Sequence, residues 1–358
     1  MNLLSRDYMR WGFPFWGRLF LLLALAVLFS GCAAKVKLNM LQPAQYHQAS
    51  LTKNIAVLPF EGKEGREMSS EIEATLAGIN IDNKQYFNIV DRASLDKVLS
   101  ELKLSQSSLT DPNSAIEIGK IVSAQGIYTG MVNTMNWKDS PFREDRQECV
   151  QHEIKRDSRG NEYEGNCIRW RRYAVRCMKR DVNVAVTPKL VEVSTGKILY
   201  SKSLTAAASS SGCEDRKPPQ GEAELFDIAK NNIKGQLRKD IAPYYVTVEV
   251  KLMDSTDGIE AKAAKENLDR GIDAASKGRI DMACELWGSA RILAPSSPAI
   301  LYNLGICAES RGDVDAALGL YKLADRAIGK PQEDITFSLN RATAAVSNKK
   351  KLEEQLKQ

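Results

Sequence analysis

Histidine is almost missing from this chain of 358 residues, which contains only His47 and His152. Nucleophilic catalysis needs a base beside the nucleophile, and zinc sites usually take histidine or closely spaced cysteine ligands. The sequence has no Cys-x-x-Cys pair, and its segment GKEGRE lacks the spacing and the lysine of a phosphate-binding loop. We therefore expect no enzymatic activity, no metal site and no bound cofactor.

A strong excess of one charge is also missing. The formal charge is +5, and the first 31 residues contribute three arginines and one aspartate to it, so about +3 remains on the rest. That imbalance is too weak to indicate nucleic acid as a partner. No later apolar run reaches the roughly 20 residues of a membrane-spanning helix, so we expect a water-soluble body.

The longest apolar run, Leu19–Phe29, lies near the N-terminus. Its length of about eleven residues is half of what a spanning helix needs. Arginines precede the run and small residues follow it, which is the layout of a cleavable secretory signal. Residues 1–31 are therefore predicted to be a signal peptide, removed from the mature protein.

The end of this segment, Leu28–Cys32, reads LFSGC and resembles the lipobox of bacterial lipoproteins. The resemblance implies that the Cys32 thiol is lipidated and becomes the new N-terminus, so that acyl chains hold the protein to a membrane. An ordinary signal peptide that ends near a cysteine is the alternative. Ala33 stands where an aspartate would indicate retention at the inner membrane. We therefore expect a lipid anchor on the periplasmic face of the outer membrane.

The remaining residues suffice for two domains. Residues 32–52 are polar and are predicted to form a tether. Residues 53–252 alternate short apolar runs with helical periodicity and are predicted to form a mixed-sheet α/β domain. The turn-prone residues 253–261 are predicted to be a linker, and 262–358 an all-α repeat domain with a capping helix.

Within the α/β domain, NIAVLPF is typical of a buried strand, and EMSSEIEATLAGI and SLDKVLSELKL each carry one apolar helical face. Asp111 before Pro112 predicts a capped helix start. The charged segment of about 138–172 interrupts this alternation and is interpreted as a hairpin or surface loop. Pro188, in a later period-two run, indicates an edge or a bulge there.

Six of the seven cysteines follow the signal. Cys149 and Cys167 are equidistant from the turn RDSRGNE, and Cys177 and Cys213 are equidistant from the turn STG. Positions equidistant from a hairpin turn face each other across an antiparallel ladder, within reach of a disulfide in an oxidising compartment. We predict these two pairs, although four cysteines allow three connectivities.

Beyond the linker, a pattern of small and aromatic residues recurs after 34 positions. These spacings resemble the tetratricopeptide repeat, whose helical hairpins usually bind a protein partner. A surface that only docks or dimerises is the alternative. The framework positions are Gly271, Ala283, Trp287, Ala290 and Pro295 in the first unit, and Gly305, Ala317, Tyr321 and Ala324 in the second.

Two further cysteines, Cys284 and Cys307, fall on neighbouring helices of these repeats. Buried free thiols are the default expectation, and a third disulfide is the alternative. The last segment, from EDITFSLNR onward, is predicted to be the capping helix, with a solvated tail.

Several stretches together resemble the CsgG-like family of envelope lipoproteins, whose best-known member forms the outer-membrane pore that exports curli subunits. They are the lipobox at Cys32, NIAVLPF, IVDRASLDKVLSELKLSQSS, AQGIYTGMV and LVEVSTGKILYS. The resemblance implies an α/β domain that faces the periplasm and assembles with copies of itself. It covers most of residues 33–252.

The sequence departs from the pore-forming members in the inserted segment, which carries charges on both strand faces. Arg or Lys at mid-depth of a bilayer costs about 2 to 4 kcal/mol each, so we do not expect this segment to cross a membrane. We predict a non-catalytic assembly or scaffold component of an envelope secretion or surface-structure complex, whose repeats recruit a protein partner. The alternative is an oligomeric export channel of the CsgG type.

An anion-binding surface is a second hypothesis. The stretch IRWRRYAVRCMKR concentrates basic and aromatic residues that could meet phosphates or carboxylates of the envelope. A solvated strand face, balanced by acidic residues of the same segment, is the interpretation we favour. The residues are Arg169, Trp170, Arg171, Arg172, Tyr173, Arg176, Lys179 and Arg180.

Overall fold

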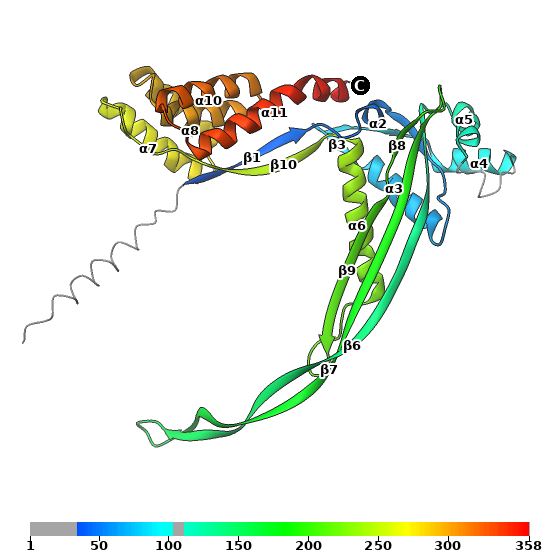
Figure 1. Cartoon of the computed structure of the whole chain (residues 1–358), viewed down its shortest axis with the longest axis horizontal. Helices are drawn as coiled ribbons and strands as arrows, with labels where there is room; N and C mark the ends of the chain where they lie inside the picture. Colours follow the sequence, from blue (N-terminus) through cyan, green and yellow to red (C-terminus); the bar gives the residue numbers. More distant parts are fainter. Residues whose placement is uncertain (1–33, 103–110, 358) are drawn as a thin grey trace, which may run out of the picture. The chain divides into compact units, whose positions relative to one another are not determined.

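The computed structural model describes residues 34–102 and 111–357 (Figure 1). The predicted signal peptide and the lipidation site Cys32 lie outside the described residues. The chain divides into two compact units. The sheet unit comprises Leu41–Tyr245 and Asn348–Gln358, and the helical unit comprises the described residues up to Met40 together with Val246–Ser347.

The sheet unit is built on a mixed six-stranded sheet in the order β5-β2-β6-β7-β8, with β9 also paired to β7. The short β2 pairs in parallel with β5 and β6, whereas β7 pairs antiparallel with β6, β8 and β9. The strands are β2 (Asn54–Val57), β5 (Asn88–Ile89), β6 (Gly126–Arg156), β7 (Glu162–Glu192), β8 (Ile198–Ser201) and β9 (Leu204–Cys213).

Helices cover both faces of this sheet. Consecutive residues of a strand point to opposite faces, so a short strand that is apolar at consecutive positions needs a cover on each face. In β2 the side chains of Ile55 and Val57 join the core under α3 and α6, whereas Ala56 joins the core under α4 and α5. Strands buried on both faces lose the polar alternation of half-exposed ones. The helices are α3 (Gly65–Ala77), α4 (Arg92–Leu102), α5 (Pro112–Ile121) and α6 (Glu222–Ile241). The predicted cap is confirmed, since Asp111 accepts a hydrogen bond from the Ser114 amide at 3.3 Å.

Strands β6 and β7 form one long hairpin of 31 residues each, and its distal part extends beyond the rest of the sheet (Figure 1). The pairing runs from Gly126 opposite Glu192 to Arg156 opposite Glu162. The segment predicted as an insertion is thus the continuation of two sheet strands. In its distal part, none of the described helices packs on either face of the hairpin. The side chains of β6 and β7 are therefore mostly exposed there and lose the alternation of apolar and polar residues, although both backbones stay extended. We call the distal part of this hairpin, residues 138–181, the ribbon; beyond Cys177 only its two strands β6 and β7 pair with each other.

Pro188 lies inside β7, opposite Gly130 of β6. On the other side of β7, β9 pairs as far as Val186 and β8 begins to pair at Lys189. Proline has no amide hydrogen to donate, so it fits the gap between two partner strands. The predicted edge is not found, since a central strand accommodates Pro188 at this gap, whereas register shifts typical of a bulge lie close by, between Val132 and Thr134 of β6 and between Leu190 and Val191 of β7.

The predicted tether also differs from the structure. Residues Lys35–Gln42 form β1, which pairs with β10 (Tyr244–Lys251) in a separate two-stranded sheet, and α2 spans His47–Leu51. Val36, Leu38 and Met40 alternate with exposed residues and join the core of the helical unit. The end of the predicted α/β domain, residues 246–252, therefore packs with the repeats, and the boundary between units falls after Tyr245.

The helical unit consists of two helical hairpins and a long final helix. Its members are α7 (Lys262–Ser276), α8 (Ile280–Leu293), α9 (Pro298–Ser310), α10 (Val314–Ile328) and the first part of α11 (Glu333–Leu356). Gly271 of α7 lies against the ring of Trp287 in α8, and Gly305 of α9 lies against Tyr321 of α10. Both aromatic side chains are fully buried. In both helical hairpins, therefore, a glycine of the first helix makes room for an aromatic ring of the second, at positions 34 residues apart, as the sequence spacing predicts.

Replacing Gly271 by alanine should destabilise the helical unit by about 1 to 3 kcal/mol, because overpacking strains a well-packed core. An added Cβ would lie 2.2 Å from Trp287 Nε1. Gly288→Ala is the control, since its Cβ would meet nothing within 4 Å and alanine favours the helix. Urea unfolding measures both. Equal stabilities of the two variants would contradict this packing.

The C-terminal end of α11 belongs to the sheet unit, and the prediction of a solvated tail is wrong. Gln355 is fully buried; its Oε1 accepts a hydrogen bond from the Ala44 amide at 2.8 Å, and its Nε2 donates to the Ala44 carbonyl at 3.3 Å. His47 Nε2 lies 3.0 Å from Glu354 Oε2. The polar sequence of the tail is compatible with burial because each buried amide group finds a partner.

Candidate functional site

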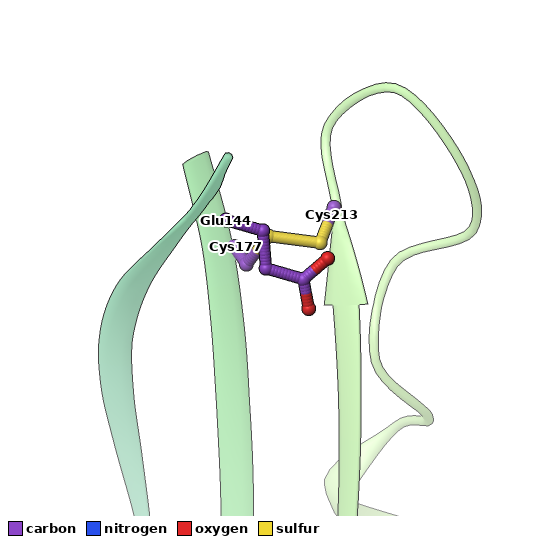
Figure 2. A group of neighbouring side chains, drawn as sticks. All are labelled: Glu144, Cys177 and Cys213. Atoms are coloured by element: carbon purple, nitrogen blue, oxygen red, sulfur yellow. A yellow bond between two sulfur atoms is a disulfide. The ribbon is translucent and has the colours of Figure 1, made fainter. Parts of the chain in front are cut away.

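The base of the ribbon is crosslinked by a disulfide between Cys177 of β7 and Cys213 of β9, which confirms the predicted pair. The two residues are direct cross-strand partners, as their equal distances from the turn predict. Figure 2 shows the Glu144 carboxylate beside this disulfide. Potential ligand atoms of the three residues lie within 4.8 Å of one another, but the sulfurs are bonded to each other and offer no thiolate to a metal.

The second predicted disulfide, between Cys149 and Cys167, is also present, near the tip of the ribbon. Here the pairing is diagonal, since Cys149 lies opposite Trp170 and Cys167 lies opposite His152. Register shifts between Cys149 and Ile154 move the two strands relative to each other. Bulges of this kind cannot be located by counting residues from the turn.

The third pair, Cys284 and Cys307, forms a disulfide between α8 and α9 with a Cα–Cα distance of 5.7 Å. The default expectation of two free thiols is therefore wrong, and the alternative is confirmed. All six described cysteines are bonded. Such usage fits a protein that matures in an oxidising compartment.

The predicted anion-binding stretch lies on the outer part of β7. Consecutive side chains of a strand point to opposite faces, so these eight residues do not form one surface. Arg180 donates two hydrogen bonds to Asp139 at 2.8 Å each and lies 5.2 Å from the ring centre of Trp137. This hydrogen-bonded arginine lowers the pKa of the Asp139 carboxyl. Other ion pairs join Arg171 with Glu148 and Lys179 with Asp181.

The acidic residues of the hairpin thus neutralise part of this basic stretch, which agrees with the favoured interpretation of a solvated face. Trp170 is 59% exposed and Tyr173 is 37% exposed. A two-stranded ribbon with exposed apolar side chains is only marginally stable alone, so these residues are candidates for contact with another chain. Binding of anions by the whole stretch remains a prediction.

Sequence reasoning missed a pocket at the base of the ribbon, which we call the ribbon-base pocket. It is lined by β6, β7, the end of β9 and the segment Glu214–Pro219 that follows β9, and its volume is about 580 Å³. Two of its arginines, Arg143 and Arg176, are cross-strand partners. Arg143 and Arg176 are almost equally far from the turn RDSRGNE in the sequence, and this spacing could have predicted that they face each other.

Sequence reasoning also missed the group around Lys53 at the end of α11. Lys53 Nζ donates to the Gln355 carbonyl at 2.7 Å and lies 3.2 Å from the ring centre of Tyr86. The Tyr86 hydroxyl is hydrogen-bonded to Ser50 and to the same Gln355 carbonyl. Burial lowers the pKa of Lys53 to about 7 and raises the pKa of Tyr86 to about 12.

These pKa values predict a pH dependence of stability. Between pH 7 and about 10, Lys53 is mostly protonated in the unfolded chain and mostly neutral in the folded one, so stability should rise with pH. Lys53→Met should remove this part of the rise. Urea unfolding at pH 7 and pH 9.5 measures the difference. The prediction fails if both proteins gain the same stability over this interval.

Two comparisons with known sequences bear on the class of protein. Residues 40–140 match the family model described as curli production assembly/transport component CsgG. This match confirms the predicted resemblance for the segment from the end of β1 into β6, so the sheet unit contains a CsgG-like segment. No curated protein matches the chain.

Several solved structures show distant likeness. The C-terminal domain of LpoB from Salmonella enterica is 17% identical over 45% of this chain and 94% of its own, with a TM-score of 0.23. Lipoprotein GNA1162 from Neisseria meningitidis is 11% identical over 52% and 97%, with a TM-score of 0.26. The PelC dodecamer from Paraburkholderia phytofirmans is 14% identical over 58% and 98%, with a TM-score of 0.23. All three TM-scores are low.

Within residues 34–102 and 111–357, no helix combines the length and the apolar content needed to cross a bilayer.

Proposed function

We propose that this protein is a non-catalytic envelope lipoprotein, anchored through Cys32 to the periplasmic face of the outer membrane. It acts as an assembly or scaffold component of a secretion or surface-structure complex. The observation that carries this proposal is the CsgG-like match over residues 40–140, downstream of a lipobox at Cys32. Three disulfides support maturation outside the cytoplasm.

The sheet unit would mediate assembly with further copies of the chain. The ribbon supports this role, because beyond Cys177 no other described strand pairs with its outer edges, and it exposes Ile154, Ile168 and Trp170 at about 60%. Edges and apolar side chains of this kind are usually covered in a native assembly. The mature protein, extracted in mild detergent with its lipid anchor, should therefore have the mass of an oligomer.

The substitution Trp170→Glu tests the role of the ribbon. It should shift the oligomer toward monomers in mass measurements, whereas Lys138→Glu, on an exposed part of the same hairpin, should not. A monomer at all concentrations would contradict self-assembly. Single-particle images in which a ring carries a detergent belt would favour an export channel over a scaffold.

The helical unit would recruit a protein partner through its helical hairpins, in the manner of the tetratricopeptide repeats that its spacing resembles. Its surface exposes Ile292 at 82% and Phe337 at 59%. Large apolar side chains are frequent anchors of protein interfaces.

Crosslinking in intact cells tests the recruiting role. Phe337→Glu and Ile292→Glu should each abolish one specific crosslinked product that wild type and Lys322→Glu retain. Lys322 is an exposed control on α10. The amount of membrane-bound protein should stay constant, because the anchor is unchanged. If neither apolar substitution changes the crosslinked products, Ile292 and Phe337 do not take part in partner binding.

A further inference from the structure

The ribbon-base pocket has a wall that is held in place from several sides. The Glu214 amide donates a hydrogen bond to the Arg176 carbonyl at 3.0 Å, and the Arg216 amide donates one to the Cys213 carbonyl at 3.0 Å. The Arg180 guanidinium donates to the Gln220 carbonyl at 3.3 Å. The segment after β9 is thus fixed against the ribbon, next to the Cys177–Cys213 disulfide.

Gly212 explains how this segment can cross the strand so closely. A Cβ at this position would lie 2.2 Å from the Lys217 carbonyl oxygen. Any other residue would push the segment away from the strand. The pocket is therefore a feature of the local fold, and does not depend on the direction of one flexible side chain.

The charges of the pocket are not balanced. Arg143 and Arg176 lie directly opposite each other on β6 and β7, and Arg216 lines the same pocket. Within the described part of the chain, none of these three guanidinium groups forms a salt bridge. Like charges directly opposite each other destabilise an antiparallel pair, so an anion between them would relieve a repulsion built into the hairpin. The acidic lining residue is Glu214.

The remaining lining is apolar, with Pro141, Met178, Pro218 and Pro219 among its members. An inorganic anion would use the arginines and leave this surface exposed to water. Arginine pairs suit the oxygens of a carboxylate or a phosphate, and apolar walls suit an aliphatic body. We propose that the ribbon-base pocket binds an anionic amphiphile, that is, a carboxylate or phosphate head group with an aliphatic chain. This binding goes beyond the proposed scaffold role and does not require it.

The probes are dodecyl phosphate and dodecanoate, used below their micelle concentrations, with the mature protein freed of anionic detergent. Calorimetry should show saturable binding of about one molecule per chain for either probe or both. Inorganic phosphate should bind at least tenfold more weakly, because it lacks the aliphatic chain. Dodecanol, which lacks the anionic head, should also bind at least tenfold more weakly.

The substitutions Arg143→Gln and Arg176→Gln should each reduce affinity for the anionic probe at least tenfold, since each removes charge-assisted hydrogen bonds. Neither should lower thermal stability in the absence of probe, because each relieves the repulsion across the ladder. Lys179→Gln is the matched control. It removes a positive charge from the same strand, outside the pocket, and should leave the affinity unchanged.

Three outcomes would overturn the proposal. The first is no saturable binding of either probe to the folded wild type. The second is equal loss of affinity in Arg176→Gln and Lys179→Gln, which would indicate general attraction to a basic surface. The third is equal binding of dodecanol, which would make the arginines irrelevant. None of these outcomes affects the test of self-assembly, so the two proposals can fail separately.

Discussion

Replacing Arg341 by methionine is expected to lower the free energy of unfolding of the helical unit by about 3 to 5 kcal/mol. The Arg341 guanidinium donates to both carboxylate oxygens of Glu309 at 2.7 Å, and the Tyr321 hydroxyl donates to the same carboxylate at 2.7 Å. The Glu309 side chain is 0% exposed and Arg341 is 18% exposed. The substitution therefore leaves a buried carboxylate without its counter-charge.

The double substitution Glu309→Met with Arg341→Met is the control for this prediction. Removing both charges together should recover much of the lost stability, because a buried ion pair is often no more stable than a well-packed apolar pair. Chemical unfolding of both single variants and the double variant completes a thermodynamic cycle. Additive losses would show that the two groups are not coupled, and the explanation would be wrong.

Replacing Cys177 and Cys213 together by alanine should lower the stability of the sheet unit by about 2 to 4 kcal/mol. This disulfide closes a loop of 36 residues, and crosslinks restrict the unfolded chain more when the loop is longer. Val175 and both cysteines form a small buried cluster, so the alanines also lose contacts.

The pair Cys149 and Cys167 is the comparison, because it closes a loop of 18 residues near the exposed tip. Its removal should cost less than removal of the Cys177–Cys213 pair. Unfolding in urea without reducing agent, followed by tryptophan fluorescence, measures both variants. A larger loss from the tip disulfide would contradict the assignment of Cys177–Cys213 as the main staple of the ribbon.

Local chemistry accounts for what could be predicted. The Cys177–Cys213 pair follows from two equal distances to a turn, because β7 keeps one register with β8 and then β9 from Leu190 outward. The cap at Asp111 depends on residues within one helical turn. Gly271 and Trp287 are close in sequence and belong to one helical hairpin. In each case the interacting residues lie within a few tens of positions.

Interactions between distant segments were not predicted. Residues 35–42 alternate in burial, but the partner strand begins at Tyr244, and no local signal connects the two. The buried position of Gln355 depends on Ala44, 311 residues away. A polar residue is buried only where its partners are supplied, and the sequence near Gln355 does not contain them.

The amino-acid sequence by itself determined the signal and lipobox prediction, the helical hairpins and two of the three disulfides, because these depend on spacing along the chain. Only the tertiary structure decided that the charged segment continues two strands, that Glu309 is buried with Arg341, and that Arg143 faces Arg176 in a pocket. Burial and charge balance depend on every segment that packs against a residue, and most of those segments are far away in the sequence.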